Sequence, residues 1–272
     1  MSFFKKIIGK VFLENREVTS SKFSDMDVEV SEKNGILSMH IGSTTIQSSM
    51  RINKPFHLEL DYTRAMSMVL LFLENPKEIL FIGLGGGTMP KFFYKFFTKA
   101  KLTVLEINLK VIQIAKHFFK LPISKRFNIV HGDGISYLKE TEHKYDLLLS
   151  DAFEDYGLPD KFCTISYFES CKNALSEKGI FVINLWGSDP KTSLYIDRIN
   201  LVFDQQVLYT ESNKPGNIIV FAFKKIGIKY SIDNLKKEIK LLEKNYGLNL
   251  MVYFTRLVKN NKQGSSNQIC FH

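Results

Sequence analysis

Apolar positions along the chain form short unbroken runs, and the segments between them repeat their apolar residues every three to four positions. The run at residues 79–82 ends in Gly-Leu-Gly-Gly-Gly at 83–87, and an aromatic-rich amphipathic segment follows at 91–97. An unbroken run is typical of a strand buried on both faces, and the three-to-four spacing is typical of a helix. The pattern therefore predicts a strand, a tight glycine turn and a helix, which form the first unit of a nucleotide-binding α/β sheet.

The same alternation continues along the chain. Further buried strands are expected at 102–106, 127–131, 145–151 and 180–185, with helices at 111–119 and from 134 to 138. Strands that alternate with helices predict parallel pairing, right-handed crossovers and helices on both faces of the sheet. Two later runs, at 206–209 and 218–223, predict an antiparallel pair at the sheet edge. The expected fold class is therefore α/β, a class I methyltransferase-like Rossmann sheet that is mostly parallel with an antiparallel edge strand.

The N-terminal part has the periodicity of strands. Residues 25–50 alternate apolar and polar side chains around Asn34-Gly35, a pair that favours the tight turn of a hairpin. A small antiparallel β domain is expected here, followed by a helix at about 57–73 that Pro76 closes. Helical spacing over residues 3–12 predicts an N-terminal helix that docks on its own protein, with a membrane surface or a partner as alternatives.

We therefore expect three parts along the chain. Residues 1–55 form an N-terminal helix and a small β-hairpin domain, and residues 56–225 form a Rossmann-like nucleoside-binding catalytic domain. Residues 226–272 supply a charged C-terminal helix near 231–245, an apolar stretch at 250–257 and a tail packed on the catalytic domain. The exposed hairpin makes a homodimer plausible.

Composition and charge narrow the class of protein. The net charge of +9 comes from lysines spread over every segment, without an arginine-rich or aromatic–basic motif, so nucleic-acid binding is not expected. No apolar run reaches the roughly 18 residues of a membrane span, so stable membrane insertion is not expected either. The cysteines and histidines lack metal-ligand spacing, which predicts no metal, and three cysteines, an odd number, fit the reducing cytoplasm.

Several consecutive strand ends carry a residue suited to bind a ligand. Glycines 83, 85 and 87 follow the first strand, Glu106 ends the second, Asp133-Gly134 follows the third and Asp151 follows the fourth. Ligands of such sheets collect at the carboxyl ends of the strands. Glu106 can accept both ribose hydroxyls of an adenosine, Asp133 can meet the adenine amino group, and the glycine turn admits a sulfur-bearing tail.

Each of these residues also has a purely structural reading. Glu106 could cap the following helix, Asp133 could form a turn, Asp151 could accept from backbone, and the glycine turn could occur without a ligand. Thr88 occupies the place of the third glycine in a dinucleotide fingerprint. A neutral or cationic nucleoside therefore suits the turn better than a pyrophosphate, although a nicotinamide enzyme stays open.

The whole pattern resembles the spermidine synthase family, the polyamine aminopropyltransferases that use decarboxylated S-adenosylmethionine. The resemblance covers most of the chain, from the N-terminal β domain to the antiparallel sheet edge. The matching segments are residues 46–50, 61–66, 82–88, 105–108, 132–134, 145–146, 151–155, 158–159, 162–164 and 167–168.

The resemblance implies a role for each matched residue. Glu106 would bind the ribose, and Asp133 with Gly134 would bind the adenine. Gln47 and Tyr62 would border the active site, and Asp151 matches the catalytic aspartate of the family. Residues that would hold a putrescine-like amine are Glu154 and Asp155, in a segment at 153–162 that forms a plausible lid.

The resemblance also implies the chemistry. An amine is mostly protonated at neutral pH, because its pKa lies near ~10, and it cannot attack in that form. Asp151 would take up the proton while the nitrogen displaces the thioether from the carbon beside the sulfonium.

The chain departs from the family pattern at three places, one of which is an early glutamine, a nucleoside contact in the family, that is replaced near Met26. The family turn usually carries an aspartate where this chain has Gly86, and the family helix usually reads Tyr-His-Glu where this chain has Tyr62-Thr63-Arg64. Two alternatives follow. The first is methyl transfer from intact S-adenosylmethionine, with Arg64 facing the donor carboxylate. The second is a nucleoside-binding homologue without turnover, which serves as an interaction or regulatory subunit.

Overall fold

The computed structural model describes residues 19–21, 28–42, 44–73, 75–152, 158–213, 216–227, 229–261, 267–269 and 271. The expected N-terminal helix lies outside the described residues, as do Glu154 and Asp155. The division of the chain at residues 55 and 225 and the homodimer stay predictions.

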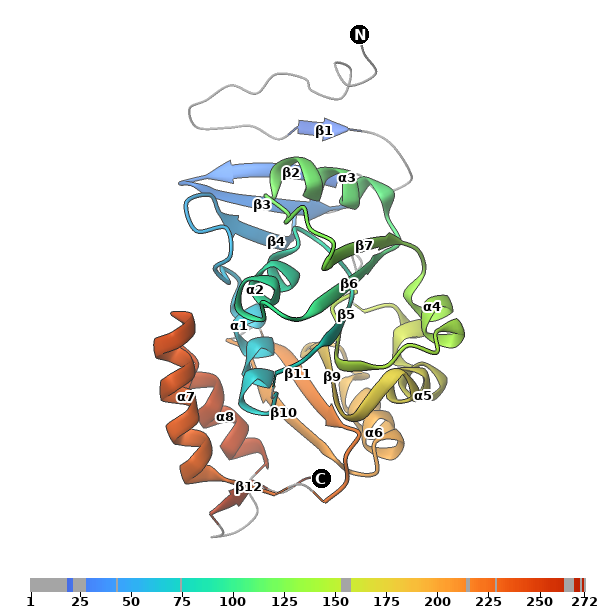
Figure 1. The fold of residues 1–272 in the computed structure, drawn as a ribbon, viewed down its shortest axis with the longest axis vertical. Helices are drawn as coiled ribbons and strands as arrows, with labels where there is room; N and C mark the ends of the chain where they lie inside the picture. Colours follow the sequence, from blue (N-terminus) through green and yellow to red (C-terminus); the bar gives the residue numbers. More distant parts are fainter. Residues whose placement is uncertain are drawn as a thin grey trace.

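The central sheet follows the strand order β10-β11-β9-β8-β5-β6-β7 within the described part of the chain (Figure 1). The pairs from β7 to β9 are parallel, and β9, β11 and β10 pair antiparallel. This confirms the predicted parallel sheet with an antiparallel edge. The strands are β5 Glu78–Ile82, β6 Lys101–Glu106, β7 Phe127–His131, β8 Tyr145–Ser150, β9 Leu175–Trp186, β10 Val207–Glu211 and β11 Asn217–Phe223.

Helices cover both faces of this sheet, and Figure 1 shows α7 and α8 on one side with α4, α5 and α6 on the other. Alternate strand residues feed two buried apolar clusters: Ile79 and Phe81 of β5 join one, while Leu80 and Ile82 join the other. This is the burial on two faces that the unbroken apolar runs predict. The helices are α2 Thr88–Phe96, α3 Leu109–Phe118, α4 Gly134–Glu140, α5 Ile165–Ala174, α6 Thr192–Val202, α7 Ile232–Tyr246 and α8 Met251–Asn261.

The N-terminal hairpin is confirmed. Strands β2 Val28–Lys33 and β3 Ile36–Ile41 pair antiparallel, and β4 Ile46–Arg51 pairs with β3. Asn34 and Gly35 both have positive φ, 54° and 71°, as a type I′ turn requires. A short strand β1 Thr19–Ser21 and the two-residue pair β12 Tyr230–Ser231 and β13 Gln268–Ile269 were not predicted.

The helix expected at about 57–73 is shorter and broken. α1 Asp61–Met66 runs into the 3-10 turn η2 Ser67–Leu71, and Leu60 before it is extended. Residues 57–60 are held outside the helix because Glu59 binds Arg51 through two hydrogen bonds of 2.9 and 2.8 Å. Where α1 changes into η2, the Ser67 hydroxyl donates to the Arg64 carbonyl.

No helix among the described residues is both long enough and apolar enough to cross a bilayer.

Candidate active site

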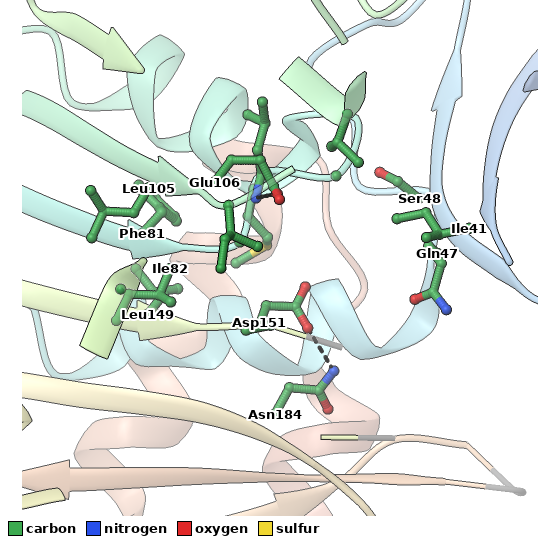
Figure 2. A pocket seen from close by; sticks show the side chains of 18 of the residues that line it. Ile41, Gln47, Ser48, Phe81, Ile82, Leu105, Glu106, Leu149, Asp151 and Asn184 are labelled. Atoms are coloured by element: carbon green, nitrogen blue, oxygen red, sulfur yellow. Dashed lines mark hydrogen bonds between the residues drawn. The ribbon is translucent and has the colours of Figure 1, made fainter. Parts of the chain in front are cut away.

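A cavity of about 320 Å³ opens at the carboxyl ends of β5, β6, β8 and β9, between the glycine turn and strand β4 (Figure 2). Most of the site residues expected from the sequence lie at this cavity. The cavity lining includes Gln47, Tyr62, Gly83, Gly85, Glu106, Asp133, Gly134 and Asp151.

The glycine turn passes close to the backbone of Asp151. Gly83 has φ of 96°, and a Cβ atom there would lie 2.4 Å from the backbone oxygen of Asp151. Gly85 has φ of 49° and faces the Ser48 side chain. At Gly83 both the positive φ and the close approach exclude a side chain, and at Gly85 the positive φ alone favours glycine.

Gly87 differs from the other glycines, because it does not line the cavity. It is the residue before α2, has φ of 67°, and a Cβ atom there would lie 2.3 Å from Cδ2 of Leu121. The structure therefore places Gly87 behind the turn, where it starts the helix. The periodic Gly-x-Gly-x-Gly pattern did not distinguish this position from Gly83 and Gly85.

Two contacts fix the turn against the N-terminal sheet. The Thr88 hydroxyl donates to the backbone carbonyl of Ser49 at 3.1 Å and lies 3.2 Å from the Ser48 hydroxyl. Both β4 residues are buried. The N-terminal sheet therefore forms one wall of the cavity, with the Gln47 and Ser48 side chains drawn there in Figure 2.

Glu106 joins the turn to the start of α3. Its Oε2 accepts from the backbone N–H of Leu84 at 3.0 Å, and its Oε1 accepts from that of Asn108 at 2.9 Å. Burial raises the pKa of the Glu106 carboxyl, and these backbone donors oppose that rise. Asn108, rather than Glu106, caps the helix by accepting from the N–H of Lys110. The backbone N–H groups of Gly85 and Ile107 also act on the Glu106 carboxylate.

Asp133 caps α4, and its neighbour Gly134 lies over the end of β5. The Oδ1 of Asp133 accepts from the N–H of Ser136 at 2.8 Å, and its Oδ2 lies 3.6 Å from Nζ of Lys161. Partial burial acts to raise the pKa of Asp133, but Ser136 and Lys161 outweigh it and hold that pKa below its usual value. A Cβ atom on Gly134 would lie 2.7 Å from Cγ2 of Ile82, so only glycine fits there without a shift.

Asp151 lies between two donors at the bottom of the cavity. Its Oδ2 accepts from the Tyr62 hydroxyl at 3.1 Å, and its Oδ1 accepts from Nδ2 of Asn184 at 2.9 Å, the dashed contact in Figure 2. Burial raises the pKa of Asp151, while the hydrogen bonds from Asn184 and Tyr62 oppose the rise. The Tyr62 hydroxyl also lies 3.2 Å from the Gln47 carbonyl oxygen. A carboxylate oriented in this way in a cavity can accept a proton from a bound nucleophile.

Sequence reasoning missed Asn184. It belongs to β9 and is 1% exposed, and its Oδ1 has no hydrogen-bond partner within the described part of the chain. A buried acceptor without a partner is rare, and here it belongs to a side chain that lines the cavity. The available signal was a lone polar residue inside the apolar run at 180–185, at the same sheet rim as Asp151.

Arg64 does not face this cavity. It lines a separate cavity of about 350 Å³ with Asp61 and Tyr253. Its NH1 donates to the Leu58 carbonyl, and its NH2 lies 3.7 Å from the Asp61 carboxylate. Two residues along a helix turn about 200° around its axis, so Arg64 points away when Tyr62 points into the cavity. The expected contact between Arg64 and a donor carboxylate is therefore wrong.

Among the described residues, no group of three or more histidines, cysteines or acids is placed to hold a metal ion.

Comparison with known proteins identifies the family. Residues 59–194 match the spermine/spermidine synthase domain. The chain is 39% identical to the polyamine aminopropyltransferase of Chromobacterium violaceum over 238 residues, which cover 87% of this chain and 91% of that protein.

Two solved structures have the same fold. A probable spermidine synthase from Corynebacterium glutamicum superposes with a TM-score of 0.71 at 17% identity, covering 85% of this chain and 94% of that one. A spermidine synthase in complex with the transition state analogue AdoDATO gives 0.64 at 19% identity, covering 77% and 74%. The sequence match over most of the chain, carried by a fold these enzymes share, shows that the chain belongs to the spermine/spermidine synthase family and is an aminopropyltransferase.

Proposed function

We propose that the protein moves the aminopropyl group of decarboxylated S-adenosylmethionine to a linear, putrescine-like amine, with Asp151 as the base. The observation that carries this proposal is the position of Asp151 between Tyr62 and Asn184, in the same cavity as Glu106 and Asp133. An enzyme of this kind needs a nucleoside site and a proton acceptor beside one another.

The nucleoside would lie along the ends of β5, β6 and β7. Glu106 would accept the ribose hydroxyls with its carboxylate oxygens, which the N–H groups of Leu84 and Asn108 orient. Asp133 and Gly134 would border the adenine, and Gly83 and Gly85 would admit the sulfonium tail. The AdoDATO complex of a structural neighbour supports a donor of this class.

The Gly86 position changes how the donor tail is held. A Cβ atom on Gly86 would lie 2.4 Å from the Phe119 ring, and Gly86 does not line the cavity. The ammonium of the aminopropyl group would therefore find its acceptors elsewhere in the cavity.

Asp151 and Asn184 would act on the incoming amine. The amine lone pair forms a bond to the aminopropyl carbon beside the sulfonium, and the carbon–sulfur bond breaks with its electrons passing to sulfur. The thioether nucleoside leaves, and the proton lost by the nitrogen goes to a carboxylate oxygen of Asp151. A second N–H of the same amine could be accepted by Oδ1 of Asn184, which is buried without a partner among the described residues.

Positioning of the amine would also contribute to the rate. Holding the nitrogen in line with the carbon–sulfur bond can contribute several kcal/mol. Glu154 and Asp155, outside the described residues, are proposed to hold the distal ammonium of the acceptor.

Methyl transfer from intact S-adenosylmethionine has lost one of its two supporting features. Arg64, expected near the donor, lines the other cavity, whereas the chain still has Gly86 where the family has an aspartate. The product analysis in the next paragraph distinguishes a homologue without turnover from an active transferase.

The test is a product analysis on the purified protein. It is incubated with decarboxylated S-adenosylmethionine or S-adenosylmethionine, and with 1,3-diaminopropane, 1,4-diaminobutane or 1,5-diaminopentane, and products are identified by mass. We expect an aminopropylated diamine only with the decarboxylated donor. A methylated product, or binding of 5′-methylthioadenosine without any product, would overturn the proposal.

The matched variant is Asp151→Asn. It keeps the size of the side chain and removes the proton acceptor, so transfer should be lost while affinity for 5′-methylthioadenosine is retained. Full activity of this variant would show that Asp151 is not the base.

A further inference from the structure

Trp186 is the last residue of β9, and it lines the same cavity as Asn184 and Asp151. Alternate residues of a strand point to the same face, so Trp186 shares the face from which Asn184 reaches Asp151. Trp186 keeps 45% of its surface exposed, although it is the largest kind of apolar side chain. A large aromatic left open at the wall of a binding cavity is typical of a ligand contact.

The backbone of Trp186 is firmly held. Its carbonyl accepts from the N–H of Asp189 at 3.0 Å and from the Thr192 hydroxyl at 2.7 Å, and the residue pairs with Asn217 on β11. Within the described part of the chain, no aromatic ring or cationic side chain stacks on the indole of Trp186. The indole therefore keeps surface that a ligand can contact, and these hydrogen bonds fix its backbone.

The spacing along β9 fits a diamine. Two residues of extended strand advance about 6.4 to 6.8 Å, which is the rise along β9 between the Cα atoms of Asn184 and Trp186. The two nitrogens of a four-carbon diamine are joined by five bonds of about 1.5 Å, which span about 6 Å in a staggered chain. If one nitrogen lies at Asp151 and Asn184, we expect the other to lie beside the indole.

We propose that Trp186 selects the acceptor by placing its indole face against the distal ammonium and methylene chain of a linear diamine. This inference rests on the proposed function, because it assumes that the reacting nitrogen lies at Asp151. An ammonium over an indole face is attracted by the ring quadrupole, most strongly for tryptophan among the aromatic residues. The indole also covers the methylenes, which a carboxylate cannot do.

The first test uses the single tryptophan of the chain as its own reporter. The protein saturated with 5′-methylthioadenosine is titrated with 1,4-diaminobutane, and tryptophan emission is recorded. We expect a saturable change in emission, and a much smaller one with butylamine, which has the same carbon chain without the second ammonium. Equal responses to both amines, or no response to either, would overturn the inference.

The second test separates affinity from turnover. Trp186→Leu keeps an apolar side chain without a π face, and we expect its KM for 1,4-diaminobutane to rise about three- to thirty-fold with kcat little changed. Trp186→Phe should restore most of the affinity. The control is Leu201→Ala, an exposed apolar residue on α6 outside the cavity lining, which should leave KM unchanged. An unchanged KM in Trp186→Leu would refute the role.

These tests also distinguish the two proposals. A saturable diamine response without any aminopropylated product would retain the Trp186 contact and refute the proposed function. Normal transfer by Trp186→Leu with an unchanged KM would retain the proposed function and refute the Trp186 contact.

Discussion

The ring of Phe119 fills the space in which a side chain at position 86 would begin. A Cβ atom on Gly86 would lie 2.4 Å from Cδ1 of Phe119 and 2.7 Å from its Cε1. Phe119 is completely buried, and its carbonyl accepts from Nζ of Lys91 at 2.7 Å. The ring therefore has little room to move, and the glycine that replaces the family aspartate belongs to a packed arrangement.

This contact predicts a steric cost for any side chain at position 86. Gly86→Ala should lower the free energy of unfolding by about 1 to 3 kcal/mol, because the new methyl group overpacks a filled site. Urea denaturation measures the change. Phe119→Leu in the same chain should relieve part of the clash, so the double variant should be less destabilised than the sum of the two single variants. If the destabilisation of the double variant equals the sum of the two single variants to within about 0.5 kcal/mol, the two positions are independent.

The hydrogen bond from Tyr62 to Asp151 predicts a shift in the pH dependence of activity. Burial raises the pKa of Asp151 and the Tyr62 hydroxyl opposes that rise, so Tyr62→Phe should raise this pKa further. Because the base must be ionised to accept a proton, the acidic limb of kcat/KM should move to higher pH. Tyr253→Phe is the control, since Tyr253 donates to Asp61 beside the second cavity. An acidic limb that stays in place or moves to lower pH in Tyr62→Phe would contradict the geometry.

The strand-end residues could be predicted from the sequence because their placement follows from local periodicity. Once the apolar runs are assigned as parallel strands, the carboxyl ends of those strands meet at one rim. Glu106, Asp133 and Asp151 therefore converge on one cavity, and the Asn34-Gly35 turn sets the N-terminal hairpin. The family resemblance added Gln47 and Tyr62, which lie far from the glycine turn in the sequence.

The remaining features depend on contacts that no local pattern reports. The Phe119 ring on Gly86 and the free oxygen of Asn184 are products of packing between distant segments. The start of α1 depends on the pairing of Glu59 with Arg51, which holds the preceding residues out of the helix. The direction of the Arg64 side chain, in contrast, could be predicted from the sequence, because helical geometry places it opposite Tyr62.

The two backbone contacts of Glu106 predict a loss of nucleoside affinity in Glu106→Gln. The glutamine amide group would bring N–H donors against the N–H of Leu84 or Asn108, and it would offer fewer acceptors to a ribose. Affinity for 5′-methylthioadenosine, measured by calorimetry, should fall about 10- to 100-fold, the range for a hydrogen bond to a charged group. Glu78→Gln is the control, because Glu78 begins β5 at the opposite end of the strand and pairs with Lys101. Equal affinity in Glu106→Gln and the native protein would exclude Glu106 as a ribose ligand.

Lys91 predicts a stability that depends on pH. It is completely buried on α2, and its Nζ donates to the Phe119 carbonyl at 2.7 Å and to Sδ of Met50 at 3.0 Å. Burial, helped by the nearby charge of Lys120, lowers the pKa of Lys91 to about 7. The unfolded chain keeps that proton up to its ordinary pKa near ~10.4. Between these values the unfolded state binds more protons, so the free energy of unfolding should rise with pH above about 7 and stay level below it.

The measurement is a series of urea denaturations between pH 6 and pH 9 on the native protein and on Lys91→Met. Each pH unit above about 7 can contribute up to about 1.4 kcal/mol, so Lys91 should add at most about 2 to 3 kcal/mol by pH 9. Lys91→Met should lack this rise and should be the more stable protein at pH 6, where a charged lysine is the less favourable occupant. Lys95→Met, an exposed position on the same helix, should keep the native slope. If the free energy of unfolding of Lys91→Met depends on pH as that of the native protein does, the buried amine is not the group that titrates. The contact between Lys91 and Phe119 would then stabilise the fold through packing alone.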